Sequence, residues 1–377
     1  MTALDDLFED GFSVNHFDFY IGVSAGSAAA ALMANGVKAE EILQANLSGE
    51  RPYYFERRDI FVPAIGEGFK SIPRAVQQLA RVFKLYLRNC REMGLVDLLE
   101  KAQETLPRGI YTLDPYSRYL EATFASKNLS NTFQGLRQAL YIPAIDLESG
   151  QSVVFGEEEY RTVPISKAIT ASSAAPIYFC PVRIEGREYI DAGIGRFACF
   201  DLAAQKAADF MLIIHPSAHS YLPPVQAPSL SERKGHRHRG FLAIADFASR
   251  INIEARFSLA LDLYTREYPD KFFVISPNPS ESLICDRSFL SFRDRVHLLR
   301  FGYFSVVHMI KAHLTRIQAV FARHGISISI QRIEERMKTR IEQLSAGEHL
   351  GSNGLAKSPA GACWASAGAK AHSYPAR

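Results

Sequence analysis

Residues 17–26 join a short apolar run to a pentapeptide with glycine at both ends, Gly22-Val23-Ser24-Ala25-Gly26. The run before it, FDFYIGV, indicates a buried strand at 17–23, and the alanine-rich residues after it predict a closely packed helix at 25–34. A strand that turns at once into a helix holds the middle residue in strained geometry, and the glycines remove side chains that would collide with nearby backbone. This feature predicts an α/β fold with Ser24 at the start of a helix.

The same pentapeptide is typical of a serine nucleophile. The serine oxygen stands clear of the sheet, over a helix N-terminus that favours developing negative charge. A five-residue match also arises by chance, as a turn of small residues. Because a strand precedes the motif and a helix follows it, we interpret Ser24 as a nucleophile.

The rest of the chain alternates strands with helices, which supports an α/β class. Strands are predicted at 138–146, 151–155, 182–184, 187–190, 210–214 and 271–275. Helices are predicted at 2–10, 38–48, 72–92, 94–105, 114–127, 164–173, 202–208 and 241–266, with more helices to about residue 344. Residues 51–73 and 217–240 are rich in turn residues, and the Gly-, Ala- and Ser-rich tail at 346–377 indicates disorder.

Composition excludes several classes of protein. A net charge of +3 over 377 residues is too small to indicate nucleic-acid binding. The five cysteines are scattered without a CxxC pair, which argues against a disulfide framework or a zinc site and favours a reducing compartment. The chain lacks a secretory leader pattern and an uninterrupted run of about 18 apolar residues. We expect a cytoplasmic protein with no metal and no cofactor, and keep peripheral contact with the inner membrane face as an alternative.

A serine hydroxyl needs a proton acceptor, and the sequence offers two. His215 ends a predicted strand and would complete a Ser-His-Asp type of triad, but only 23 residues precede Ser24, fewer than the α/β-hydrolase order needs. Asp191 follows a predicted hairpin strand and precedes Ala192 and Gly193. Burial would raise its pKa and make it a better base, although a turn aspartate that caps Gly193 is the structural alternative.

Three ordered motifs resemble the bacterial patatin-like phospholipases. They are Gly22-Val23-Ser24-Ala25-Gly26-Ser27, the segment AITASSAAPIYF at 168–179, and Tyr189-Ile190-Asp191-Ala192-Gly193. The segments LYIPAID at 140–146 and RFGY at 300–303 look like that family as well. The resemblance covers roughly residues 1–312 and implies a three-layer α/β/α sandwich that cleaves acyl esters with a Ser-Asp dyad.

Carried over to this chain, the resemblance implies that Ser24 is the nucleophile and Asp191 its base. The nucleophile elbow would include Gly22 and Gly26, the base loop Gly193, and the segment at 168–179 would support the wall beside the dyad. The implied reaction is attack on a lipid ester carbonyl, an acyl-Ser24 intermediate, and hydrolysis by water.

Two departures from the family pattern are visible. The family's glycine-rich oxyanion loop follows its first strand, ahead of the elbow, and no glycine here precedes Gly11. The first strand and the loop are therefore expected to be missing, and losing one such donor costs about 2.7–4 kcal/mol. Ala192 also replaces the usual glycine after the base, which predicts restricted backbone geometry there.

Three further features have two interpretations each. Aromatic side chains at 51–73 line an acyl pocket or pack in the interior. The basic run at 232–239 binds an anionic headgroup or a metal, or is a solvated loop. An apolar stripe lies on a membrane or packs on the domain. The aromatic residues are Tyr53, Tyr54, Phe55 and Phe61, and the stripe is Phe304, Val307, Ile310, Leu314, Ile317 and Phe321.

The sequence thus predicts an acyl-hydrolase domain at 1–312, C-terminal helices at 313–345 and a disordered tail at 346–377. The predicted function is hydrolysis of phospholipid or acylglycerol esters. The alternative is a catalytically impaired lipid-binding or scaffold protein with the same fold.

Overall fold

The computed structural model describes residues 1–64, 84, 108–194, 198–216, 241–268, 271–276 and 295–351. The predicted helices at 72–92 and 94–105 lie outside the described residues, apart from residue 84. The predicted loop at 217–240, with its basic run, also lies outside them, as do residues 352–377 of the predicted tail.

The main sheet has the strand order β1-β4-β7-β6, with β5 paired to β4. Its strands are β1 (Phe19–Ile21), β4 (Ala139–Asp146), β5 (Ser152–Phe155), β6 (Val182–Ile184) and β7 (Arg187–Asp191). β1 runs parallel to β4, whereas β5 and β7 pair with β4 in the antiparallel sense. Residues of β4 from Ile142 to Asp146 are all buried, as expected for a strand covered on both faces.

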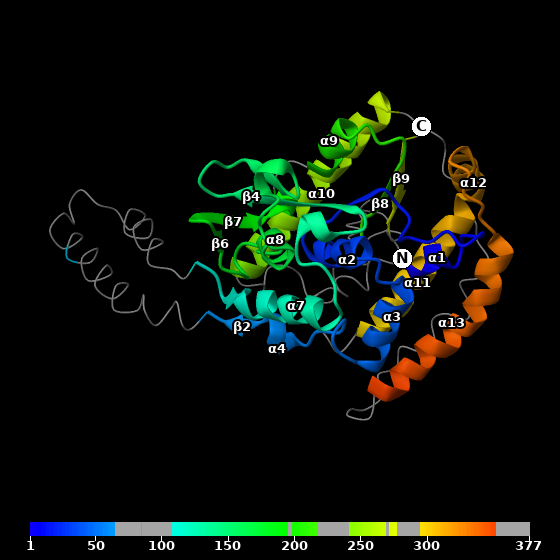
Figure 1. Cartoon of the computed structure of the whole chain (residues 1–377), viewed down its shortest axis with the longest axis horizontal. Helices are drawn as coiled ribbons and strands as arrows, with labels where there is room; N and C mark the ends of the chain where they lie inside the picture. Colours follow the sequence, from blue (N-terminus) through cyan, green and yellow to red (C-terminus); the bar gives the residue numbers. More distant parts are fainter. Residues whose placement is uncertain are drawn as a thin grey trace, which may run out of the picture.

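Three helices pack beside this sheet and share one apolar core with it. They are α2 (Ala25–Ala34), α7 (Asp114–Ser126) and α8 (Ile165–Ser172). α2 contacts β1 and β4, and α8 contacts α2, α7, β4 and β7 (Figure 1). Phe124, Ile142 and Ile169, each at most 1% exposed, belong to this core. The small residues of α2 allow the close approach of helix and sheet that a strand-to-helix elbow requires.

A second, parallel pair of strands has helices on both faces. It comprises β8 (Met211–Ile214) and β9 (Phe272–Ile275). Phe272 packs with Phe200 of α9 (Ala198–Gln205) and Phe257 of α10 (Phe241–Glu267). The next residue, Phe273, packs in a separate core with the N- and C-terminal helices. Because successive strand residues point to opposite faces, this alternation places the pair inside a sandwich.

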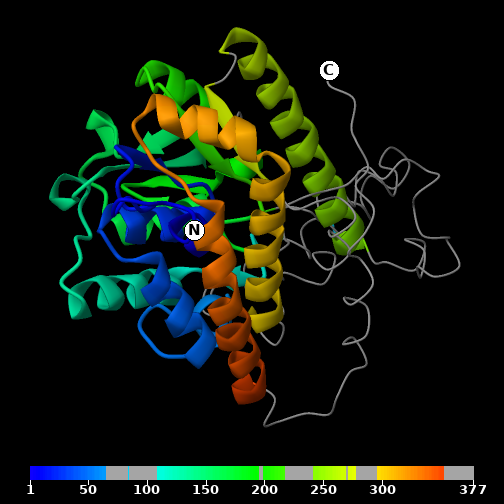
Figure 2. The same ribbon diagram turned by 90° about the vertical axis from the view of Figure 1, so that its right-hand side faces the viewer.

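The N- and C-terminal helices form one group. It contains α1 (Thr2–Asp5), α3 (Ala39–Ser48), α11 (Arg295–Ala312), α12 (Leu314–Arg323) and α13 (Ile330–Gly351). Figure 2 shows α11 and α13 running side by side. Asp6, buried at the end of α1, pairs with Arg340 of α13 through Nε–Oδ2 and Nη2–Oδ1 contacts of 2.9 and 3.1 Å. With helices on both sides of the strands, the chain is a three-layer α/β/α sandwich with C-terminal helices.

The remaining elements are short. They are α4 (Arg57–Ile60), β2 (Val62–Pro63), β3 (Tyr111–Thr112), η1 (Phe133–Gly135), η2 (Glu158–Tyr160) and η3 (Ala192–Ile194). β2 and β3 pair in the antiparallel sense. The described part of the chain contains no helix that combines the length and apolarity needed to span a membrane.

Several predicted boundaries differ from those observed. The helix predicted at 2–10 ends at Asp5, because residues 7–9 bond with the segment before α13 instead: Glu9 N–H donates to the Ser327 carbonyl and Ser329 N–H to the Leu7 carbonyl. The strand predicted at 17–23 spans only Phe19–Ile21, and the helix predicted at 202–208 spans Ala198–Gln205. α13 continues to Gly351, past the predicted start of the tail, since extending an existing helix is far easier than nucleating one.

Candidate active site

The elbow forms as the sequence predicts. Ser24 lies between β1 and α2 with φ of 52° and ψ of −131°, in the positive-φ region that non-glycine residues rarely adopt. The Ser24 carbonyl accepts hydrogen bonds from the Ser27 amide at 2.9 Å and the Ser27 hydroxyl at 2.5 Å. These contacts hold the strained residue in place at the helix start.

The two elbow glycines have different roles. A Cβ on Gly22 would lie 2.5 Å from Ser27 Cα and 2.8 Å from Ala30 Cβ, so β1 and α2 pack too closely for any side chain there. A Cβ on Gly26 would meet no atom within 4 Å among the described residues. The prediction of steric necessity is confirmed for Gly22 and is wrong for Gly26.

Ser24 and Asp191 are in direct contact. The Ser24 hydroxyl donates to Asp191 Oδ2 at 2.6 Å, the geometry that proton transfer from the nucleophile requires. β4 brings the two residues together: β1 pairs with its first residues, and Asp191 lies opposite Ala144 further along it.

The Asp191 carboxyl group is buried, with the residue only 7% exposed. Burial raises its pKa above the ordinary aspartate value, while the hydrogen bonds from the Ser24 hydroxyl and the Gly193 amide lower it and offset only part of that effect. The Gly193 N–H donates to the second oxygen, Oδ1, at 2.8 Å. A carboxylate with a raised pKa accepts a proton more readily than an exposed one.

The residue that follows Asp191 does not adopt a left-handed backbone conformation. Ala192 belongs to the 3-10 helix η3 and is not among the positive-φ residues, so a Cβ is tolerated there without strain. Alanine at this position therefore fits the backbone conformation observed. Gly193 is more constrained, since a Cβ there would lie 3.3 Å from Asp191 Oδ1.

The N-terminus of α2 presents one backbone amide beside Ser24. Gly26 N–H donates to the Val23 carbonyl, and no acceptor takes the Ala25 N–H among the described residues. The residue after the nucleophile is the usual source of one oxyanion donor in an elbow of this kind. Ala25 N–H is thus a candidate donor to a developing oxyanion.

A turn at the end of α8 supports both members of the Ser24–Asp191 pair. The buried Ser172 hydroxyl accepts the Ser24 N–H at 3.0 Å, and the Ala174 carbonyl accepts the Asp191 N–H at 3.1 Å. The sequence motif predicted a supporting wall in this segment but not the individual contacts. Ser172 and Ser173 are adjacent and identical in type, so the sequence holds no signal to separate them.

His215 is engaged elsewhere. Its Nε2 lies 3.0 Å from Glu254 Oε2 of α10, and its ring stacks on Phe257 with centroids 4.0 Å apart. The oxygen that contacts the Ser24 hydroxyl belongs to Asp191. The alternative triad through His215 is therefore wrong.

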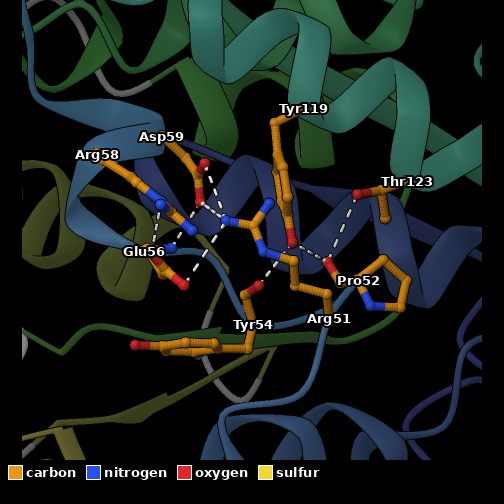
Figure 3. Close-up of polar contacts among 8 residues, drawn as sticks. All are labelled: Arg51, Pro52, Tyr54, Glu56, Arg58, Asp59, Tyr119 and Thr123. Carbon is orange, nitrogen blue, oxygen red and sulfur yellow. Dashed lines mark hydrogen bonds and ion pairs between the residues drawn. The ribbon is translucent and has the colours of Figure 1, made fainter.

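The segment at 51–59 is anchored to α7 by polar contacts (Figure 3). The Arg51 guanidinium pairs with Asp59 at 3.0 Å and lies over the Tyr119 ring, 5.0 Å from its centroid. The Tyr119 hydroxyl is within 2.6 Å of both the Pro52 and Tyr54 carbonyls. These contacts fix the backbone of residues 51–59, which the sequence indicates only as irregular.

The aromatic residues of this region pack against other parts of the chain. Their ring or cation–π partners are Lys127 for Tyr53, Arg295 for Tyr54, Tyr116 for Phe55, and Tyr111 and Phe179 for Phe61. These rings line neither the cavity beside Tyr268 and Phe272 nor the cavity beside Phe133 and Tyr141. The contacts favour the packing interpretation over the acyl pocket.

Four of the six residues in the apolar stripe of α11 and α12 are also interior. Val307, Ile310, Ile317 and Phe321 are each at most 4% exposed and belong to the core shared with α1 and α3. These four residues of the stripe pack on the protein, whereas Phe304 and Leu314 are only partly buried.

Among the described residues, no group of three or more His, Cys, Asp or Glu side chains could hold a metal ion. The groups that the structure places around Ser24 include its own hydroxyl, the buried Asp191 carboxyl group and backbone amides.

Comparison with known proteins adds to this geometry. No curated protein matches the chain. A model of the family described as patatin-like phospholipase matches residues 2–204, more than half of the chain, and this range contains both Ser24 and Asp191. Members of that family are lipid acyl hydrolases. With its elbow serine beside a buried aspartate and its three-layer sandwich, the chain belongs to the patatin-like phospholipase family.

Proposed function

We propose that the chain is a serine lipid acyl hydrolase that cleaves phospholipid or acylglycerol esters through a Ser24–Asp191 dyad. The observation that carries the proposal is the 2.6 Å hydrogen bond from the Ser24 hydroxyl to Asp191 Oδ2. A serine becomes a useful nucleophile when an adjacent base takes its proton. The buried carboxylate supplies that base without a histidine.

The reaction has two halves. Ser24 Oγ attacks the ester carbonyl while its proton passes to Asp191, and the alcohol leaves with a proton from Asp191 as the acyl-Ser24 ester forms. Water then gives a proton to Asp191 and attacks the acyl-Ser24 ester. Asp191 returns that proton to Ser24 Oγ as the fatty acid is released, which restores the dyad. The Ala25 N–H and the N-terminus of α2 favour the negative charge that develops on the carbonyl oxygen in both halves.

The test is turnover of a p-nitrophenyl acyl ester by the wild type and by Ser24→Ala. Removing a nucleophile that acts together with its base lowers kcat by about 1,000-fold or more. A Ser24→Ala variant that keeps its activity would place the reaction at another residue.

A second candidate function is lipid binding by a catalytically impaired member of the family. One observation favours it. Among the described residues, a single candidate oxyanion donor, the Ala25 N–H, has been identified beside Ser24. Loss of one oxyanion donor slows such reactions by about 100- to 1,000-fold. In that case lipid vesicles would bind equally to the wild type and to Ser24→Ala, and neither would release fatty acid.

A further inference from the structure

We propose that Ser172 is a positioning residue for the nucleophile. Its hydroxyl fixes the strained peptide of Ser24, and the turn that it begins, residues 172–174, sets the distance between Ser24 and Asp191. The inference rests on the proposed function, because it assigns a part in the same reaction.

The first support is the contact itself. Ser172 is the last residue of α8, is fully buried, and accepts the Ser24 N–H on its Oγ at 3.0 Å. Ser24 has a φ of 52°, and a non-glycine residue stays in that region only when its surroundings hold it there. The Ser172 hydroxyl is one of the groups that does so: it binds the Ser24 N–H, whereas Ser27 binds the Ser24 carbonyl.

The second support is that the same turn holds the base. The Ala174 carbonyl, two residues after Ser172, accepts the Asp191 N–H at 3.1 Å. The turn is itself fixed, since Ser173 N–H donates to the Ile169 carbonyl at 3.0 Å and Ala175 N–H to the Ser173 carbonyl at 2.8 Å. One short rigid segment therefore positions both the nucleophile and the base.

Position 173 provides a natural control. Ser173 Oγ is buried and has no hydrogen-bond partner in the described structure. Ser172→Ala and Ser173→Ala remove the same atom from adjacent residues of one turn. Only the first removes a contact to Ser24.

Loss of the Ser172 acceptor should act on kcat. Without this hydrogen bond, the backbone of Ser24 relaxes toward ordinary geometry. The Ser24 hydroxyl then moves out of hydrogen-bonding position with Asp191 Oδ2. Loss of a hydrogen bond to this partly buried donor corresponds to about a 10- to 100-fold effect. KM should change little, because a fully buried hydroxyl is out of reach of substrate.

The experiment measures kcat and KM for a p-nitrophenyl acyl ester, the rate of fluorophosphonate labelling and the melting temperature. It compares the wild type with Ser172→Ala and Ser173→Ala. We expect Ser172→Ala to label and turn over about 10- to 100-fold more slowly, with KM unchanged, and Ser173→Ala to match the wild type. Equal rates for the two alanine variants would overturn the inference.

A second pair of variants tests the inference if Ser172→Ala proves unstable. Ser172→Thr and Ser172→Val have nearly the same shape, but only threonine keeps the acceptor oxygen. Faster labelling of the threonine variant supports the inference, and identical labelling of the two contradicts it. If the wild type fails to label, the proposed function itself is wrong.

Discussion

Ser24 and Asp191 are 167 positions apart in the sequence and 2.6 Å apart in space, hydroxyl to carboxylate. The contact depends on β4, which pairs with β1 near one end and with β7 near the other. Because the strand before the nucleophile and the strand that ends in the base share this neighbour, the registers of two strand pairs determine the geometry of the dyad.

Replacing Asp191 with asparagine should abolish ester turnover and leave the fold intact. Asparagine has nearly the same shape as aspartate. It also removes a carboxyl group whose charged form is disfavoured by burial, so the fold should not lose stability. We expect kcat to fall by about 1,000-fold or more with a melting temperature within a few degrees of the wild type. Activity near the wild-type level in Asp191→Asn would exclude the dyad.

Asp146 is a matched control for that variant. It is a second buried aspartate of the sheet, but its carboxylate bonds to Arg187 at 2.8 Å and to the Ser149 hydroxyl at 2.9 Å. Asp146→Asn should therefore lower the melting temperature and leave kcat of the folded protein unchanged. Asp191→Asn is thus predicted to lose activity and keep its stability, whereas Asp146→Asn is predicted to lose stability and keep its kcat.

The pH dependence of kcat/KM should report the ionisation of Asp191. The base must be deprotonated to act, and burial raises its pKa above the ordinary value. Activity should therefore be full at higher pH and fall, as pH decreases, at a pH above the usual aspartate range near 4. His215→Gln should leave this fall in kcat/KM at low pH unchanged. If the fall disappears in that variant, the ionisation belongs to His215 instead.

The elbow glycines should differ in their tolerance of alanine. Gly22→Ala places a methyl group 2.5 Å from Ser27 Cα, so β1 and α2 must separate, and both stability and kcat should fall. Overpacking of this kind costs about 1–3 kcal/mol. Gly26→Ala meets open space within α2 and should fold at least as stably as the wild type. Equal destabilisation by both changes would contradict the close packing of β1 against α2 at Gly22.

Arg340→Met should destabilise the whole domain. It leaves Asp6 buried without its charged partner, a change that typically costs about 3–5 kcal/mol. Lys311→Met breaks another ion pair of α13, with Glu334, but both of those side chains are well exposed. That variant should cost at most about 1 kcal/mol. Similar urea midpoints for the two variants would show that α13 is not an integral part of the fold.

The local features of the site could be predicted from sequence because they depend on residues near one another in the chain. Gly22 and Ser24 mark the elbow, and the hairpin ending in Asp191 marks the carboxyl group that contacts Ser24. The boundary of α1 could not be predicted, since the backbone groups of residues 7–9 bond to a segment more than 300 positions later. The Asp6–Arg340 pair and the Ser172 contact likewise depend on tertiary packing, which leaves no periodic signal in the sequence.

The most direct test of the account is to treat the purified protein with a fluorophosphonate probe and locate the adduct by peptide mass spectrometry. The account predicts one adduct, on Ser24, that is absent from Ser24→Ala and formed far more slowly in Asp191→Asn. An adduct on a different serine, or no adduct on a folded wild-type protein, would contradict the assignment of Ser24 as the nucleophile.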